Sequence, residues 1–354
     1  MINKLTTEQF LEKAASLPVL DVRAPLEFTA GHIPGAISFP LFTDAERKQV
    51  GTAYKQISRD KAILIGLDYF GPKMSGFVKL ATKLAPQKEV LLHCWRGGMR
   101  SNGVAWLLDL AGFTVNLLEH GYKDYRHFAL AQFEKKYPLV ILGGMTGSGK
   151  TEILHQLQQA SESIIDLENL AHHKGSSFGL IGQPPQTTTE QFENDFALAL
   201  YGQNIRQPKR LWLEDEGISI GKVNIPKPFY EQMQAATLIK IEVPKIERIR
   251  KLAREYCQAD KALLTEAILR IKKRLGGLAT KEALQAIETD DMEKMVELAL
   301  VYYDKAYSYQ LANKNPQQII TIPLPTTNAA ENTQQILEVL QRKQTAIKTT
   351  SQPD

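Results

Sequence analysis

Residues 137–151, YPLVILGGMTGSGKT, join an apolar run to a glycine-rich turn and the start of a helical pattern. The last eight residues fit the phosphate-loop pattern G-x-x-x-x-G-K-[ST] without a mismatch. In such a loop, backbone N–H groups approach phosphate oxygens, lysine adds positive charge and threonine can bind Mg²⁺. The sequence therefore predicts an α/β domain with a phosphate or diphosphate site. The residues expected to form it are Gly144, Thr146, Gly147, Ser148, Gly149, Lys150 and Thr151.

A phosphate loop usually works with an acid that follows a neighbouring strand and helps to hold Mg²⁺. Residues 210–213 read as such a strand, and Glu214, Asp215 and Glu216 come directly after it. We take Asp215 with Thr151 as the candidate Mg²⁺ ligands, the alternative being that the three acids form a solvated turn. No tightly bound cofactor is expected. His173, Lys174 and Ser176 are further candidates for this second site.

A second strand–loop–helix unit lies upstream, at residues 89–110. Its loop contains Cys94, Arg96, Gly97, Gly98 and Arg100. Backbone N–H groups of a tight glycine loop form an anion nest, and the helix N-terminus and the arginines add positive charge. Such a setting favours the thiolate, which can attack sulfur, selenium or phosphorus. A buried structural cysteine is the alternative, but it needs neither paired glycines nor two arginines.

Length and composition bound the organisation of the chain. Its 354 residues, 43% hydrophobic and 23% charged, suit two folded domains and exclude a disordered protein. We expect a first domain over residues 1–135, a second over 136–325 with a helical segment at about 246–310, and a terminal helix with a disordered tail over 326–354. Two cysteines make no disulfide framework, and no apolar run approaches the ~20 residues of a membrane span, so a cytoplasmic protein is expected.

Charge is distributed unevenly along the chain. The net charge is +4, and residues 1–135 carry all of it, with 17 basic and 13 acidic residues. Residues 245–274 add a local cluster of ten basic residues against four acids. This pattern is typical of either a nucleic-acid-binding surface or a solvated helical face.

The first domain resembles the rhodanese family. Residues 21–28, DVRAPLEF, and 31–36, GHIPGA, are similar to the entry signature of that family, and Gly112-Phe113 and Gly121-Tyr122 to its closing segment. The resemblance implies sulfur or selenium carried on Cys94. Five residues separate Cys94 from Arg100, where the simplest sulfurtransferases have four. This H-C-x5-R spacing also occurs in rhodanese-like phosphatases and arsenate reductases, so both chemistries stay open.

The two motifs together resemble bacterial tRNA 2-selenouridine synthases, from about residue 4 to 340. Segments outside the two loops also match, at residues 46–55, 166–176, 214–221 and 274–277. Three residues depart from the family pattern: Lys174 stands for arginine, and His120 and Gly217 replace a glycine and a serine. None of the three removes an expected catalytic group. The fold implied is an N-terminal rhodanese-like parallel-sheet domain, then a P-loop NTPase-like α/β domain with a helical C-terminal extension.

The resemblance implies a transferase that converts 2-thiouridine at the tRNA wobble position to 2-selenouridine. Selenophosphate, supplied by a separate enzyme, would be the donor, and the route would pass through S-geranyl-2-thiouridine made from geranyl diphosphate. Cys94 would carry selenium as S-selanylcysteine, and the phosphate loop would hold the diphosphate.

The same resemblance favours tRNA backbone binding by the basic cluster, with Trp95 stacking on the wobble base. The candidate tRNA contacts are Trp95, Lys245, Arg248, Arg250, Lys251, Arg254, Arg270, Lys272, Lys273 and Arg274. Two other functions were weighed: a cysteine phosphatase or arsenate reductase fused to an NTPase, and a non-enzymatic sulfur-carrier and nucleotide-binding adaptor.

Overall fold

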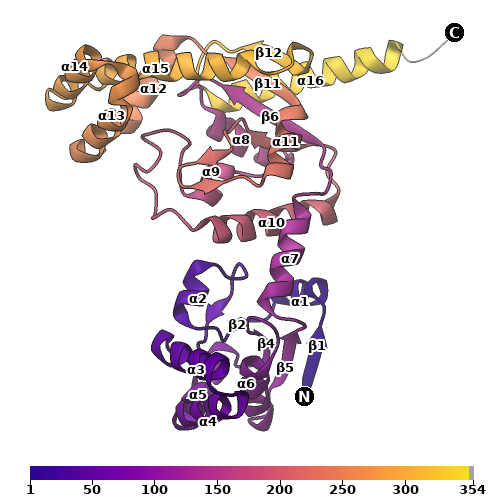
Figure 1. Cartoon of the computed structure of the whole chain (residues 1–354). Coiled ribbons are helices and arrows are strands. Elements are labelled where there is room, and N and C mark those ends of the chain that lie inside the picture. Colours follow the sequence, from indigo (N-terminus) through magenta and orange to yellow (C-terminus); the bar gives the residue numbers. More distant parts are fainter. Residues whose placement is uncertain (351–354) are drawn as a thin grey trace. The chain divides into compact units, whose positions relative to one another are not determined.

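The computed structural model describes the backbone of residues 1–350 and the side chains of residues 1–342. The chain forms two compact units (Figure 1). The first unit comprises Met1–Phe133 together with Thr188–Leu198, and the second comprises Glu134–Thr187 and Ala199–Asp354. The last helix continues to Thr350, within the segment 326–354 predicted as a terminal helix with a disordered tail, and residues 351–354 lie outside the described residues.

A parallel five-stranded sheet forms the centre of the first unit, in the order β1-β5-β4-β2-β3. Its strands are β1 (Ile2–Leu5), β2 (Val19–Asp21), β3 (Ile37–Ser38), β4 (Glu89–His93) and β5 (Thr114–Leu118). β4 is a buried central strand, and its Val90, Leu91 and Leu92 are fully buried. Cys94 follows directly, at the carboxyl edge of the sheet, where α/β folds place their ligand sites.

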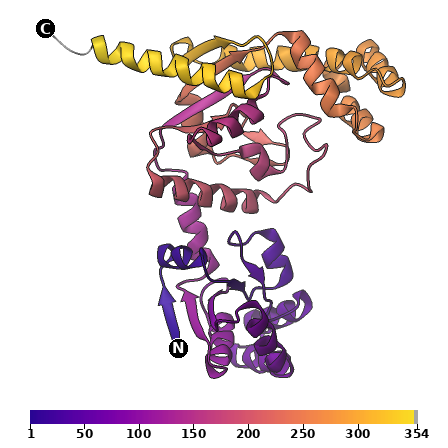
Figure 2. The ribbon, with the colours of Figure 1, turned by 180° about the vertical axis from the view of Figure 1, so that it is seen from behind.

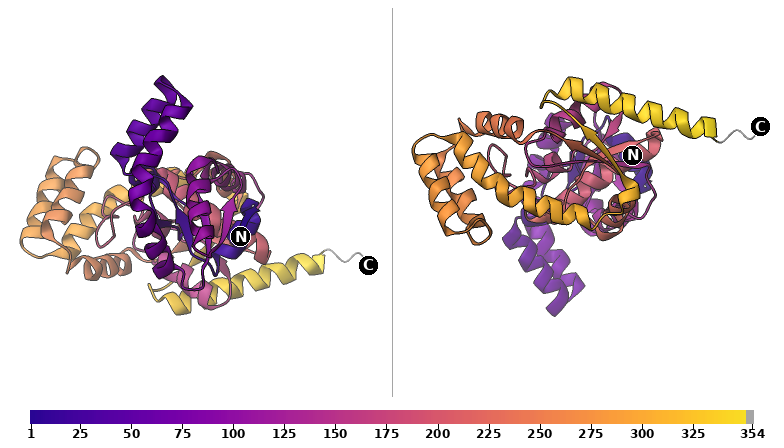
Figure 3. Two further views of the ribbon diagram at one scale, coloured as in Figure 1. Left: turned by 90° about the horizontal axis from the view of Figure 1, so that it is seen from below. Right: turned by 90° about the horizontal axis from the view of Figure 1, so that it is seen from above.

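Seven helices of the first unit surround that sheet. They are α1 (Thr7–Ala14), α2 (Pro25–Ala30), α3 (Asp44–Gln56), α4 (Arg59–Phe70), α5 (Met74–Leu84), α6 (Met99–Leu110) and α7 (Tyr122–Gln132). α3 and α4 form a hairpin that extends away from the sheet, as the left view of Figure 3 shows. Thr43 and Glu46 form a capping box at the start of α3, which fixes where this helix begins.

The second unit has its own parallel sheet, in the order β12-β11-β6-β8-β7. The strands are β6 (Leu139–Gly144), β7 (Ser163–Ile164), β8 (Leu211–Glu214), β11 (Thr237–Glu242) and β12 (Ile319–Pro323). β9 (Ser219–Ile220) and β10 (Val223–Asn224) pair as a small antiparallel ribbon. β6 lies in the middle of the sheet beside β8, so the phosphate loop and the acids after β8 meet at one edge.

Helices cover this second sheet, and some of them form a separate bundle on one side of it. They are α8 (Lys150–Gln159), α9 (Leu167–Ala171), α10 (Thr189–Arg206), α11 (Lys227–Ala235), α12 (Lys245–Tyr256), α13 (Lys261–Leu275), α14 (Gly277–Glu288), α15 (Met292–Ala312) and α16 (Ala329–Thr350). α12 to α15 enclose a core of their own, which is the predicted helical segment. α16 packs against α8, and Figure 2 shows it from behind.

The predicted fold class is confirmed, and the predicted strands lie within one or two residues of those observed. The sequence did not indicate that Thr188–Leu198, part of α10, belongs to the first unit. Phe192, Asn194 and Phe196 of this segment are fully buried there. No helix of the part of the chain that the structure describes is long and apolar enough to span a membrane.

Candidate active sites

The cysteine loop is built on a close approach between two turns. Cys94 is buried, and its Sγ lies 3.2 Å from Oγ of Ser101, which in turn donates to the carbonyl of Gly98 at 3.1 Å. The backbone of Gly121 packs directly against this loop: a Cβ on Gly121 would lie 2.4 Å from the Cys94 carbonyl oxygen. Its φ of +66° is also one that glycine adopts most readily. The N–H of Tyr122 then donates to the same carbonyl at 2.8 Å, which fixes the loop from below.

The two predicted loop arginines have different roles. Arg96 is exposed, whereas the Arg100 guanidinium donates to both carboxylate oxygens of Glu27, at 2.6 and 3.2 Å. Burial opposes ionisation of Glu27, but the bonds from Arg100 outweigh it and hold the pKa of Glu27 below its usual value. Arg100 therefore ties the start of α6 to α2, rather than standing alone as a charge for an anion.

The rhodanese-like signature at residues 21–28 supplies a buried ion pair beneath this loop. Arg23 is 1% exposed and donates to Asp21 at 2.6 Å and to the carbonyl of Gly31 at 2.7 Å. Its guanidinium lies 3.8 Å from the ring centre of Tyr122 and 6.0 Å from that of Trp95. Trp95 is half-buried and packs 5.7 Å from the Tyr122 ring, so one side of it is a packing contact.

The inserted segment Thr188–Leu198 completes this support. Glu190 accepts a hydrogen bond from the Tyr122 hydroxyl at 2.8 Å, and Asn194 donates to the same oxygen at 2.7 Å. Asn194 also donates to the His32 carbonyl at 2.9 Å. Side chains from far along the sequence thus position the residue on which the cysteine loop rests.

The phosphate loop has the strand–loop–helix geometry that its sequence predicts. Gly147 and Gly149 have φ of +82° and +83°, and the Lys150 ammonium turns back to donate to the Gly144 carbonyl at 3.0 Å. Ser148 is buried. The carbonyl of Thr146 accepts from Arg248 at 3.1 Å, so α12 supports the loop from behind.

Three glutamates gather in front of this loop. Glu168, Glu214 and Glu216 bring carboxylate oxygens within 4.8 Å of one another, and Thr151 donates to Glu168 at 3.3 Å. Glu214 is fully buried, and neither of its carboxylate oxygens has a hydrogen-bond partner among the described residues. Glu168 belongs to a segment quoted for the family resemblance, yet sequence reasoning did not select it.

Burial and mutual repulsion keep these carboxyls from ionising easily. They raise the pKa of Glu168 and of Glu216 to about 8 and that of Glu214 well above its usual value. Asp215, the predicted Mg²⁺ ligand, also lines the cavity described below but is not part of this cluster: its Oδ1 accepts from Lys314 at 2.6 Å. The structure therefore brings Thr151 together with the three glutamates rather than with Asp215.

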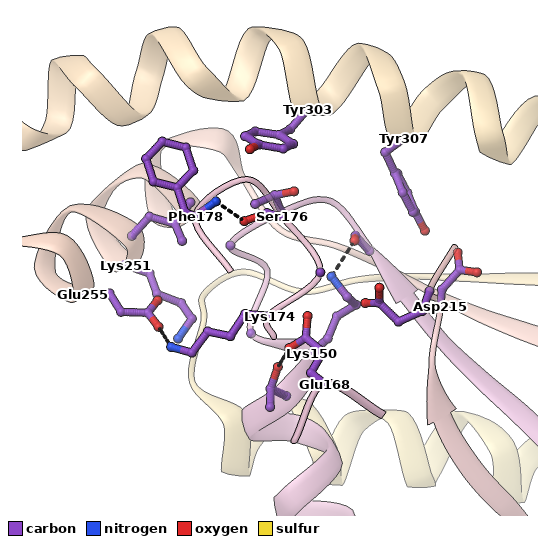
Figure 4. Close-up of a pocket in the computed structure, with 18 of the residues that line it drawn as sticks. Lys150, Glu168, Lys174, Ser176, Phe178, Asp215, Lys251, Glu255, Tyr303 and Tyr307 are labelled. Atoms are coloured by element: carbon purple, nitrogen blue, oxygen red, sulfur yellow. Dashed lines mark hydrogen bonds and ion pairs between the residues drawn. The ribbon is translucent and has the colours of Figure 1, made fainter. Parts of the chain in front are cut away.

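A cavity of about 490 Å³ contains this site and has two kinds of wall. One end holds the phosphate loop with Glu168 and Glu216, and the other is aromatic. Figure 4 shows Tyr303 and Tyr307 pointing down from α15 and Phe178 beside them. The aromatic lining residues are Phe178, Tyr256, Tyr302, Tyr303 and Tyr307.

The other predicted second-site residues divide between the cavity wall and the packing behind it. Lys174 and Ser176 line the cavity; Lys174 pairs with Glu255 at 2.6 Å, and Ser176 Oγ accepts from the N–H of Phe178 at 3.1 Å. His173 is 7% exposed, and burial lowers its pKa. A Cβ on Gly179 would lie 2.7 Å from its ring, so this histidine serves as packing for the turn.

The basic cluster of residues 245–274 does not form one continuous surface. Arg248 is 3% exposed, and its guanidinium binds Asp304 at 2.8 and 2.9 Å, so it is not available to a tRNA phosphate. Lys251 pairs with Glu152 and lines the cavity. The remaining predicted contacts are exposed: Lys245, Arg250, Arg254, Arg270, Lys272, Lys273 and Arg274.

A cysteine loop of rhodanese type and a phosphate loop, on separate parallel sheets, are the features of a two-domain enzyme. Family comparison agrees: a rhodanese-like domain matches residues 6–127, and the tRNA 2-selenouridine synthase AAA domain matches residues 137–345. The chain belongs to the tRNA 2-selenouridine synthase family.

Individual relatives are similar in sequence to this chain along most of their length. The tRNA 2-selenouridine synthase of Shewanella frigidimarina is 35% identical, over 85% of this chain and 90% of its own. Those of Shewanella sediminis and Shewanella loihica are 36% and 37% identical, over 85% of this chain and 90% and 89% of theirs. A crystal structure of an N-terminal domain from Clostridium difficile 630 is 38% identical, covering 37% of this chain and 99% of its own with a TM-score of 0.33.

Proposed function

We propose that this chain acts on tRNA and exchanges sulfur for selenium at carbon 2 of a wobble 2-thiouridine, in two steps. In the first step the thiocarbonyl sulfur attacks carbon 1 of geranyl diphosphate; a carbon–sulfur bond forms and diphosphate leaves. In the second step the selenium of selenophosphate adds to carbon 2 and geranylthiol leaves. Water then cleaves the selenium–phosphorus bond and releases phosphate, so no oxidant or reductant is needed.

The observation that carries this proposal is the double character of the 490 Å³ cavity. A prenyl diphosphate has a strongly anionic head and an apolar tail. The glycine-rich loop with Lys150 suits the head, and the aromatic wall of Tyr302, Tyr303 and Phe178 suits the tail. A nucleotide would instead need polar groups that form hydrogen bonds with its base.

Residues of the chain itself would offset the charge of the leaving diphosphate and exclude water from the reacting carbon. Lys150 offsets negative charge that grows on the leaving diphosphate, which is worth most in a site screened from solvent. The aromatic wall keeps water from the geranyl carbon, where hydrolysis would compete with sulfur.

Mg²⁺ fits the glutamate cluster better than Asp215. Glu214 is buried with both carboxylate oxygens lacking hydrogen-bond partners among the described residues, and oxygen ligands suit a hard cation. Thr151, Glu168, Glu214 and Glu216 would hold the ion, which would supply positive charge next to the diphosphate. Asp215 already has Lys314 as its counter-charge.

We assign the second step, in which the selenium of selenophosphate adds to carbon 2, to the cysteine loop of the first unit. The Cys94 sulfur is close to Ser101 and held at the edge of the sheet, and Trp95 beside it offers a face for an unpaired base. Arg100, the arginine of the H-C-x5-R spacing, is engaged by Glu27, which argues against its use as the anion-binding arginine of a cysteine phosphatase.

A reconstitution tests the whole scheme. The full chain is incubated with 2-thiouridine tRNA, geranyl diphosphate, selenophosphate and Mg²⁺, and the nucleosides are measured by mass spectrometry. We expect S-geranyl-2-thiouridine when selenophosphate is omitted and 2-selenouridine when it is present. Absence of both products would refute the proposal, and selenation that proceeds without geranyl diphosphate would refute the first step.

A further inference from the structure

The helix α3 carries residues 46–55, ERKQVGTAYK, a segment to which neither loop assigns a role. Arg47, Gly51 and Lys55 recur every four residues, so they lie along one face of the helix. Lys48 and Thr52 form the adjacent row. This surface therefore carries the positive charges of Arg47, Lys48 and Lys55, and only small side chains lie between them.

The acids near this surface offset part of its charge. Glu27 is paired with Arg100 and lies 3.5 Å from Nε of Arg47, and Asp44 accepts from the N–H of Leu26 at 2.9 Å. Lys48 and Lys55 are exposed, and neither forms an ion pair with a side chain that the structure describes. These two lysines are therefore the positive charges that the surface can offer to a partner.

Two hollows run along this face and meet at one pair of residues. The first, about 380 Å³, is lined by α3 from Asp44 to Gln56 and by the start of α2. The second, about 360 Å³, includes Trp95 and Glu190. Arg47 and Glu27 line both hollows, so a path leads from Lys55 along α3 to the residue beside Cys94. We call this path the α3 groove.

Gly51 shapes the floor of the α3 groove. A Cβ at this position would lie 2.6 Å from Nη1 of Arg47, so the Arg47 guanidinium lies close over the helix beside this glycine.

We propose that the α3 groove binds the sugar–phosphate backbone of the single-stranded loop of tRNA and leads its wobble base to Trp95 and Cys94. The proposal rests on the proposed function, because it takes tRNA as the substrate. Arg47 and Lys55 are separated by ~12 Å along the helix, enough to contact more than one phosphate. Phosphate contacts fix the register of a strand, while stacking selects an unpaired base.

Paired lysine substitutions test the groove. Lys48→Ala with Lys55→Ala removes two charges from the groove, and Lys79→Ala with Lys83→Ala removes two exposed charges from α5 in the same unit. Binding of tRNA to each full-length variant is measured by fluorescence anisotropy at several salt concentrations. We expect the groove variant to lose affinity on the order of tenfold and its salt slope to fall by about 1.4. The α5 variant should bind like the unchanged protein.

Kinetics and a single substitution complete the test. In the groove variant the KM for tRNA should rise while the KM for geranyl diphosphate stays the same. Thr52→Glu, at an exposed helical site, should weaken tRNA binding while leaving the unfolding temperature unchanged. Unchanged affinity and salt slope in the groove variant, or an equal loss in the α5 variant, would overturn the proposal. Binding is measured without turnover, so this result is independent of whether 2-selenouridine forms.

Discussion

The cysteine loop and the phosphate loop share one construction but treat charge in opposite ways. Each follows the central strand of a parallel sheet and precedes a helix. Around the cysteine, every buried charge has its partner: Asp21 binds Arg23, and Glu27 binds Arg100. Around the phosphate loop, Glu214 has no hydrogen-bond partner among the described residues, and two more glutamates crowd it. The first site balances its own charges, whereas the second leaves buried carboxyls that the proposed function pairs with a cation.

The largest effects are expected in a test that assigns each loop to one step of the reaction. Lys150→Ala should reduce geranyl transfer by about 10²–10³-fold, because a charge that stabilises the leaving diphosphate is lost. Cys94→Ser should retain geranylation and lose selenation. Both are measured by mass spectrometry of nucleosides from single-turnover reactions. Equal effects of the two substitutions on both products would show that the loops do not divide the reaction.

The balanced charges of the first unit predict a large loss of stability when they are broken. Arg23→Ala leaves the Asp21 carboxylate buried without its partner and should cost about 3–5 kcal/mol of unfolding free energy. Chemical denaturation at pH 7 measures this. Lys79→Ala, on the surface of the same unit, is the control.

The pH dependence of that loss has a defined direction. Although burial raises it, His93 and Arg23 hold the pKa of Asp21 below its ordinary value of 3.8. The pair therefore stabilises the protein above that pH, and the stability is lost as the pH falls through the lower folded-state pKa. In Arg23→Ala the contribution of Arg23 is lost and burial is opposed by His93 alone, so the pKa of Asp21 rises and acid unfolding should begin at a higher pH. An identical acid transition in both proteins would contradict this account.

Glycine substitutions test how closely the cysteine loop is supported. Gly121→Ala places a Cβ 2.4 Å from the Cys94 carbonyl oxygen at a φ of +66°, so the loop must shift, at a cost of roughly 1–3 kcal/mol. Gly98→Ala, in the same loop, meets nothing within 4 Å. Selenation should therefore fail in the first variant and persist in the second. Loss of selenation in Gly98→Ala alone would indicate that open space above the loop matters more than its support.

Substitution in the glutamate cluster should raise the stability of the protein, whereas Arg23→Ala lowers it. Glu214→Gln removes a buried carboxyl that repels its neighbours once they ionise, so above pH 8 the metal-free protein should unfold about 2–4 °C higher. The gain in unfolding temperature on adding Mg²⁺ should shrink. Asp215→Asn, which leaves Lys314 without its counter-charge, should instead lower the unfolding temperature. Calorimetry with and without Mg²⁺ measures both, and a destabilised Glu214→Gln would contradict the proposed cation site.

Local features were predictable from the sequence because their signals are local. The phosphate loop and the cysteine loop each lie within a few consecutive residues, and glycines at fixed spacing reveal them. Glu168 could not be selected in this way, because its carboxylate meets Glu214 and Glu216 only when α9 and β8 are packed together. Arg248 looked like its basic neighbours, although Ile249, Leu252 and Ala253 place it on the buried face of α12.

The segment Thr188–Leu198 has a consequence for how the protein is made. The first unit lacks Phe192, Asn194 and Phe196, all buried within it, until the ribosome has passed residue 198. At ordinary rates of synthesis, the 65 residues between Phe133 and Leu198 take roughly 3–13 s to appear. During that interval the support of Tyr122 is missing, so the N-terminal unit completes its folding only after about a quarter of the second unit has been synthesised.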